Sequence, residues 1–203
     1  ADSSAVTSAK QWPARRAELA RLVQHYEYGY LPQAPADTPK VDVLFEDANW
    51  LGGKGVLKEL AITHTPGAAP CRMLIAAPSA GPSPAFVVLN FHGNHTACVD
   101  PRVALPTGFV RSAGPGAENN RATDAGRAKS PMPLPHILER GYAVATCYYG
   151  DFRHDDPDQG GVEPHLTPPP DADAYTQPGA IMIWAWGLMR MAEILRSDPL
   201  IDG

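Results

Sequence analysis

The stretch that decides the fold is AFVVLNFHGNHT, residues 85–96, in which a short apolar run stops abruptly at a polar, glycine-containing turn. Residues 85–91 have the composition of a strand that is buried on both faces. A second run of the same kind, YAVATCYY at residues 142–149, follows a short helical segment at 134–140. Strand, helical crossover and strand in this order predict a parallel pair at the centre of a sheet.

Helices and strands alternate along the rest of the chain. Residues 13–29 repeat apolar side chains at helical spacing and predict an amphipathic surface helix. Residues 178–196 are apolar around nearly the whole circumference of a helix, so we expect other parts of the protein to cover them on all sides. The remaining segments are an extended, proline-rich connection at 31–40, antiparallel strands at 41–45 and 56–65, and a further strand at 71–77.

This alternation predicts an α/β fold, a three-layer sandwich with a mostly parallel sheet. The 203 residues suffice for one domain with a sizeable core and are too few for two ordinary ones. The formal net charge is −5, from 17 Lys and Arg against 22 Asp and Glu, and no basic run interrupts that balance. We therefore expect no nucleic-acid partner and no membrane partner, because an electrostatic footprint is missing and no apolar stretch reaches the roughly 18 residues of a membrane span.

Long polar loops follow both buried strands, at residues 93–133 and 150–177. In doubly wound sheets, ligands bind outside the carboxyl ends of the strands. A loop of this length inside a compact domain is usually functional. The functional site is therefore expected where these two loops begin.

The first loop opens with Gly93, Asn94 and His95. Glycine lets the main chain approach a ligand closely, and in α/β-hydrolases this position supplies a main-chain N–H to the oxyanion hole. The N–H groups of Asn94 and His95 are thus candidate donors, the alternative being a strand-ending turn with a structurally hydrogen-bonded histidine. His92, His95 and Asp100 also suggest zinc ligands, but a second ligand cluster and an H-E-x-x-H helix are missing. We expect no metal and no cofactor.

The second loop carries an acidic cluster. Its members are Asp151, His154, Asp155, Asp156 and Asp158. The cluster lacks the ligand spacing of an EF-hand, so we expect most of it to be solvated surface. Asp151 directly follows the strand and is the member that we expect to face a site. Trp184 and Trp186, in the apolar helix, are expected in the core.

A nucleophile is missing from the sequence. There is no G-x-S-x-G turn, and the serines of the glycine- and proline-rich loops do not lie between a strand and a helix. The cysteines are Cys71, Cys98 and Cys147, without C-x-x-C spacing. Cys71 and Cys147 are expected as buried thiols and Cys98 as a free thiol. No catalytic residue of a triad can be assigned within these residues.

Four segments together resemble the amino-terminal half of glucuronoyl esterases, carbohydrate esterase family 15 of the α/β-hydrolase superfamily. They are YGYLP at 28–32, LNFHGNHT at 89–96, GYAVATCYYGD at 141–151 and GAIMIWAWGLMRMAEIL at 179–195. The resemblance implies that residues 1–203 are the amino-terminal part of a single α/β-hydrolase domain, truncated before the nucleophile strand. In the strand order of that fold, residues 85–91 then lie at an unprotected sheet edge.

The resemblance also implies a function. It is serine-type hydrolysis of glucuronate esters that link xylan to lignin, with a G-x-S-R-x-G turn, an acid and a histidine beyond Gly203. Gly93, Asn94 and His95 then form part of the pocket wall, with Asp151 as a weaker candidate. The implied partners are a glucuronoxylan–lignin ester and the remainder of the chain's own polypeptide.

Other interpretations of the chain stay open. A related hydrolase of other specificity, such as an acetyl or other carbohydrate esterase, would share the fold and differ in the downstream pocket. A noncatalytic carbohydrate-binding or accessory module would explain the missing triad, although such modules are usually all-β. The polar start at Ala1 is of the kind that signal-peptide removal leaves, so we expect a secreted or periplasmic protein.

Overall fold

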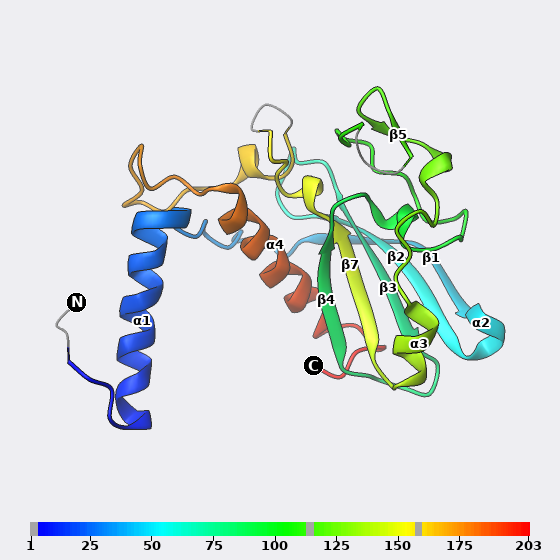
Figure 1. The fold of residues 1–203 in the computed structure, drawn as a ribbon, viewed down its shortest axis with the longest axis horizontal. Coiled ribbons are helices and arrows are strands. Elements are labelled where there is room, and N and C mark those ends of the chain that lie inside the picture. Colours follow the sequence, from blue (N-terminus) through cyan, green and yellow to red (C-terminus); the bar gives the residue numbers. More distant parts are fainter. Residues whose placement is uncertain (1–3, 113–115, 157–159) are drawn as a thin grey trace.

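The computed structural model describes residues 4–112, 116–156 and 160–203 (Figure 1). Ala1, at the polar start, and Asp158, of the acidic cluster, therefore lie outside the described residues. The helices are α1 (Trp12–Val23, continued by a π-helical turn at Gln24–Tyr28), α2 (Trp50–Gly53), α3 (Leu134–Glu139) and α4 (Ala180–Leu195). None of the described helices is long and apolar enough to cross a membrane.

The main sheet runs in the order β1-β2-β3-β7-β4. Its strands are β1 (Lys40–Asn49), β2 (Gly55–Thr63), β3 (Cys71–Pro78), β4 (Ala85–Asn90) and β7 (Ala143–Tyr148), and β5 (Ala117–Glu118) with β6 (Arg121–Ala122) forms a separate small hairpin. The predicted parallel pair, β4 with β7, is confirmed, as are the antiparallel strands β1 and β2. The β2–β3 and β3–β7 pairs are also antiparallel, so this part of the sheet is mixed rather than mostly parallel. The apolar composition of β3 reports burial on both faces, which does not fix the direction of its neighbours.

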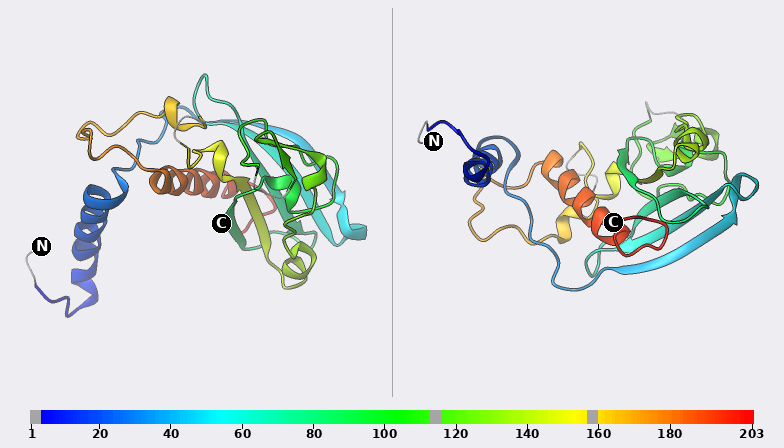
Figure 2. Two further views of the ribbon diagram at one scale, coloured as in Figure 1. Left: turned by 45° about the horizontal axis from the view of Figure 1, so that its top comes forward. Right: turned by 90° about the horizontal axis from the view of Figure 1, so that it is seen from below.

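Helices cover both faces of the sheet and confirm the three-layer sandwich (Figure 2). Successive residues of β3 point to opposite faces, as in any strand. Met73 and Ile75 join the core beneath α4, whereas Leu74 and Ala76 join the core beneath α3. All three cysteines are buried and form no disulfide among the described residues. Burial was expected for Cys71 and Cys147, and it raises the pKa values of all three thiols.

Two expectations about burial are wrong. β4 is an edge strand within the described sheet, as the resemblance implies, and Phe86 and Val88 are 52% and 37% exposed, so the burial on both faces expected from its composition is wrong. The α4 helix is not covered all round, because Ile181 and Met189 are also exposed. Composition reports how apolar a segment is, and here the apolar side chains of β4 and α4 have no neighbouring strand or helix on one side.

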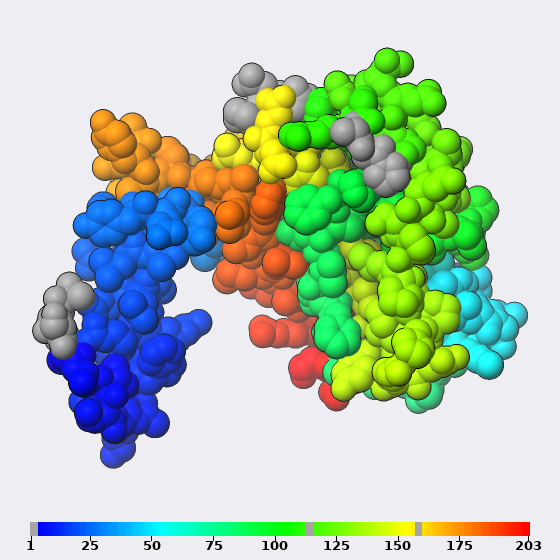
Figure 3. Space-filling model, in the orientation of Figure 1, coloured from blue at the N-terminus to red at the C-terminus, as the bar shows by residue number. Residues whose placement is uncertain are grey.

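The predicted surface helix is confirmed, but none of its residues is buried, and Leu19, Val23 and Tyr26 of its predicted apolar side are exposed. A wide notch separates α1 from the C-terminal end of α4 (Figure 3). The helix joins the rest of the protein near Gly29, which has a φ of +79° and whose added Cβ would lie 2.0 Å from the Gln177 carbonyl oxygen. On either side of Gly29, the Tyr28 carbonyl accepts the N–H of Gly179 and the Tyr30 N–H donates to Thr176.

Candidate functional site

The site begins at the turn after β4, where Gly93 has a φ of +94°. A Cβ at this position would lie 2.5 Å from Pro106 Cγ, so only glycine fits without displacing the neighbouring loop. The Gly93 N–H donates to Asn90 Oδ1 at 2.6 Å, and the Gly93 carbonyl accepts the N–H and the hydroxyl of Thr96. These bonds close a 3₁₀ turn at Asn94–Thr96 directly above the strand end.

Asn94 fastens this turn to the sheet. It is 3% exposed, and its Nδ2 donates to the carbonyl of Arg72 in β3 at 2.9 Å. Its Oδ1 accepts from Asn90 Nδ2 at 2.7 Å, and the same Asn90 amide donates to Thr146 Oγ1 of β7 at 3.0 Å. Three strands are therefore linked through Asn90 and Asn94. The side chain of Asn94 has a structural role, which leaves its main chain as the part that can meet a ligand.

The main-chain N–H groups of Asn94 and His95 donate to no acceptor in the part of the chain that the structure describes. The next two N–H groups, of Thr96 and Ala97, donate to the carbonyls of Gly93 and Asn94. The first donors of a 3₁₀ or α-helical turn are left without intrahelical acceptors. Two adjacent donors at the carboxyl end of a strand of the parallel pair are an arrangement that can stabilise an oxyanion.

The His95 side chain is fully buried beside the turn. Burial, and to a lesser degree Arg127, lowers the pKa of His95 to about 4, so the imidazole is neutral. Neither ring nitrogen has a hydrogen-bond partner among the described residues, which argues against the alternative of a structurally hydrogen-bonded histidine. The three-ligand zinc alternative finds no support either. The described residues contain no group of three potential ligands, and the Asp100 carboxylate is paired with Arg102.

The loop that follows returns to the turn and closes on it. The N–H groups of Ala128, Ser130 and Met132 donate to the carbonyls of His95, Thr96 and Ala97. Inside the loop, Arg127 Nη1 donates to the carbonyls of Asp100 and Val103 at 2.8 and 2.9 Å. The buried Glu59 of β2 accepts the N–H of Ala104 at 3.0 Å, and burial raises the pKa of this carboxyl. The loop is thus tied to the sheet beneath it.

Asp151 lies beside the same part of β3. Its Oδ2 accepts the N–H of Arg72 at 3.0 Å, and its carbonyl accepts from Cys71 Sγ at 3.6 Å. Burial raises the pKa of Asp151 to about 7, against the lowering effect of Arg72. Asp151 and Asn94, both singled out from the sequence, therefore meet at one residue of β3.

Aromatic side chains gather between the two strand ends. Tyr149 lies 4.8 Å from the ring of Phe91 and 5.4 Å from that of Trp184, and its hydroxyl lies 2.8 Å from His154 Nε2. Trp186 is in the core as expected, but Trp184 is only partly buried and donates to the carbonyl of Arg153. In the acidic cluster, Asp155 is exposed as expected, whereas His154 is buried.

The three-layer sandwich, the glycine turn after β4 and the adjoining N–H donors together are those of an α/β-hydrolase. Comparison with known proteins shows which esterases the chain is similar to. No protein-family model matches the chain. Carbohydrate esterase MZ0003, from an unknown prokaryotic organism, is 32% identical over 99% of the chain and 48% of its own length. A segment of 64 residues is 39% identical to 4-O-methyl-glucuronoyl methylesterase 1 of Wolfiporia cocos, over 32% of the chain and 15% of that protein.

Solved structures of esterases show the same similarity. The glucuronoyl esterase from Solibacter usitatus matches 97% of the chain and 52% of its own with a TM-score of 0.81 at 28% identity. A promiscuous CE15 esterase from a marine bacterial metagenome matches 99% and 52% with a TM-score of 0.80 at 31% identity. The predicted resemblance to esterases of carbohydrate esterase family 15 is confirmed over almost the whole chain, which spans about half the length of each of these relatives.

Proposed function

We propose that residues 1–203 form part of a serine-type carboxylic ester hydrolase that acts on glucuronate esters linking xylan to lignin. The observation that carries the proposal is the pair of unpartnered N–H groups at Asn94 and His95, held at the end of β4 by Gly93 and Asn94. A serine attacking an ester carbonyl generates an oxyanion, and main-chain donors at this position would stabilise it. The glucuronoyl esterases to which the chain is similar support the choice of ester.

The serine, the acid and the histidine are proposed to come from the remainder of the same polypeptide. The surface that would receive it is the outer edge of β4, where Phe86 and Val88 are exposed. Ile201 already forms a parallel bridge with Ser83, beside the start of this edge. A further strand that continues this pairing would cover the edge of β4. The carboxyl end of that further strand would then lie next to the Gly93 turn, where ligands of such sheets bind.

The test uses the longest polypeptide that the gene encodes. We expect it to contain a G-x-S-R-x-G turn within about 15 residues after Gly203, because a short strand and a sharp turn are enough to place such a serine. It should hydrolyse benzyl glucuronate, and replacing that serine by alanine should abolish hydrolysis. His95→Ala should reduce the rate only in part, because the main-chain donor survives loss of the side chain. A polypeptide without any serine turn would refute the esterase and leave an accessory module.

A second candidate is a carbohydrate esterase of other or broader specificity, such as an acetyl esterase. It is favoured by the similarity to a CE15 esterase that is described as promiscuous. Comparing kcat/KM on benzyl glucuronate and on acetylated xylose separates the two candidates. We further propose that the protein is exported, which fractionation of the source cells into medium, periplasm and cytoplasm tests directly.

A further inference from the structure

The apolar side of α1 lacks a cover in the part of the chain that the structure describes. Leu19, Leu22, Val23 and Tyr26 recur there at helical spacing, and Leu19, Val23 and Tyr26 are 44%, 42% and 75% exposed. Trp12, in the first turn, is 50% exposed. A helix of about 12 residues is only marginally stable in water, and packing of an apolar face supplies most of the stability of helices in proteins. A helix of this kind needs a partner that packs on its apolar side.

α1 is fastened at its C-terminal end, near the start of α4. The carbonyl of Tyr28 accepts the N–H of Gly179, and the side-chain oxygen of Gln24 accepts the N–H of Leu31 at 2.9 Å. From this attachment the helix runs along the notch, on the side opposite the main sheet (Figures 1 and 3). The attachment therefore holds α1 as one wall of the notch.

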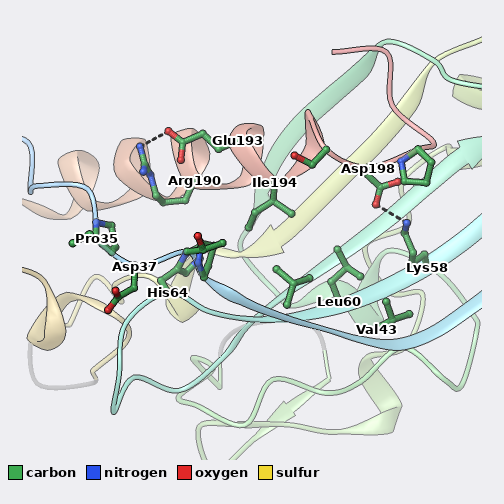
Figure 4. A pocket seen from close by; sticks show the side chains of 16 residues that line it. Pro35, Asp37, Val43, Lys58, Leu60, His64, Arg190, Glu193, Ile194 and Asp198 are labelled. Carbon is green, nitrogen blue, oxygen red and sulfur yellow. Dashed lines mark hydrogen bonds and ion pairs between the residues drawn. The ribbon is translucent and has the colours of Figure 1, made fainter.

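The main sheet can grow towards α1. β4 is the strand of this sheet nearest to α1, and its open edge faces the notch (Figure 1). After α4 the chain turns at Asp198, whose Oδ2 lies 2.5 Å from the buried Lys58 Nζ and whose Oδ1 accepts the N–H of Leu200 (Figure 4). This turn brings Ile201 to its parallel bridge with Ser83, beside the start of β4. Strands added after this bridge would extend the sheet from β4 into the notch.

The relatives described above are about twice as long as this chain. The esterases from Solibacter usitatus and from the marine metagenome match 97% and 99% of the chain, so the matched part includes most of α1, and the matches span 52% of their own chains. In a polypeptide of that length, a second segment of about equal size has to pack against the first. The edge of β4, the notch and the apolar side of α1 border one place that can receive it.

We propose that the apolar side of α1 is a docking surface for the polypeptide that follows Gly203. This segment fills the notch and is held from two directions, by the edge of β4 and by Leu19, Val23 and Tyr26 of α1. Residues 9–28 carry four basic and two acidic side chains, although the whole chain has a net charge of −5. The surface that meets α1 should therefore be apolar with carboxylates at its rim. The proposal rests on the continuation of the polypeptide proposed above, but not on its esterase activity.

Hydrogen exchange measured by mass spectrometry on the longest polypeptide that the gene encodes tests the docking. Amides of a helix that packs on other parts of the protein exchange slowly, whereas those of an uncovered helix exchange fast. Leu19→Glu places a charge on the docking surface and should speed the exchange of residues 16–23 at least about tenfold. Ala20→Glu is the matched control, because it adds the same side chain at the next, exposed position, off the apolar side, and should exchange as the wild type does. Equal exchange in the wild type and both variants would contradict the docking.

Photo-crosslinking identifies what covers α1. With p-benzoylphenylalanine in place of Tyr26, irradiation should join the helix to a peptide from beyond Gly203 of the same molecule, whereas the same replacement at Ala20 should give little product. A cross-link to a second copy or to residues 4–203, or a polypeptide that ends at Gly203, would overturn the proposal. Circular dichroism checks that each variant is folded, and the cross-link decides alone if Leu19→Glu is not.

Ester hydrolysis is measured separately on the same preparations. A slowly exchanging and cross-linked α1 in a protein that hydrolyses no ester would keep the docking surface and reject only the esterase. Ester hydrolysis by a protein whose α1 exchanges fast and gives no cross-link would keep the esterase and reject the docking surface.

Discussion

Asn94 and Asp151 bind the two main-chain polar groups of one residue, Arg72. The Asn94 amide donates to the Arg72 carbonyl at 2.9 Å, and the Asp151 carboxyl accepts the Arg72 N–H at 3.0 Å. The two loops that follow β4 and β7 are thereby fixed to the start of β3 and to each other. The position of the candidate oxyanion donors consequently depends on the sheet. A substitution at Asn94 or Asp151 should therefore disturb both loops.

Replacing Asn94 by alanine should lower the free energy of unfolding by about 1–3 kcal/mol, because the Arg72 carbonyl and the Asn90 amide each lose a buried partner. Urea denaturation of the complete polypeptide measures the change. Gln33→Ala, at an exposed side chain, is the control and should stay within about 0.5 kcal/mol of the wild type. If Asn94→Ala behaves like this control, the network does not stabilise the turn.

Asp151→Asn should change how stability depends on pH. Burial raises the pKa of Asp151 from 3.8 to about 7 in the folded protein, so the folded state binds the proton more tightly than the unfolded chain does. The stabilisation by this proton is full below about pH 4 and is lost as the pH rises through about 7. Asparagine is neutral throughout, so the free energy of unfolding of the variant minus that of the wild type should increase between pH 4 and pH 8.

The control for this measurement is Asp171→Asn, at an exposed carboxyl. The free energy of unfolding of this variant minus that of the wild type should show no such rise. Because other titrating groups are shared by both proteins, taking differences removes their contribution. A flat difference for Asp151→Asn would mean that its carboxyl is ionised in the folded protein at pH 4.

Gly93→Ala should destabilise the protein and slow ester hydrolysis. The added Cβ would meet Pro106 Cγ at 2.5 Å in a backbone conformation that alanine disfavours. Gly81→Ala is the control, because Gly81 also has a positive φ but an added Cβ there has nothing within 4 Å. Gly93→Ala should be less stable than Gly81→Ala by at least about 1 kcal/mol on thermal unfolding, since overpacking typically costs 1–3 kcal/mol. Gly81→Ala should keep the wild-type kcat/KM, and equal stability of the two variants would contradict the contact with Pro106.

The exposed edge of β4 should behave differently in the isolated chain and in the complete polypeptide. Residues 1–203 expressed alone should aggregate, and Phe86→Lys should increase their solubility, since a charge blunts an open edge. In the complete polypeptide the same change should lower the free energy of unfolding by roughly 1–3 kcal/mol, because it buries a charge where another strand is proposed to pack. Light scattering and urea denaturation measure the two effects.

Tyr175→Lys is the control for this pair of measurements. Tyr175 is 94% exposed and should affect neither solubility nor stability when replaced. Unchanged stability of Phe86→Lys in the complete polypeptide would argue that nothing covers β4. A monomeric 203-residue product that melts cooperatively would show that the edge needs no cover.

The pattern of apolar residues located the strands but did not show which of them lies at an edge of the sheet. Residues 85–91 and 142–149 are almost equally apolar, yet β7 is buried along its length and β4 lies at an edge. Position in a sheet depends on which strands pair, and pairing is decided by contacts between residues far apart in the sequence. The crossover through α3 was visible in the sequence, and for that reason the parallel pairing was predicted correctly.

The glycine turn was found because its signal is local, a strand that stops at His-Gly. Its supports, Asn90, Thr146 and Glu59, were missed. Each is a polar residue inside an apolar strand, and a buried polar group must find a hydrogen-bond partner. That pattern could have marked them as part of a network, although it could not have named Asn94, Arg72 or Ala104 as the partners.

The closure of residues 128–132 onto 95–97 has a consequence for how such proteins diversify. Between these two fastened ends the segment leaves and returns at neighbouring points, and it is anchored again at Ala104 and Pro106, so the length of the part beyond Pro106 can change without shifting the strands. A segment with that property can be exchanged as a module between related proteins while the Gly93 turn stays in register. The loop that approaches the site can therefore change in evolution while the main-chain N–H groups of Asn94 and His95 stay in place.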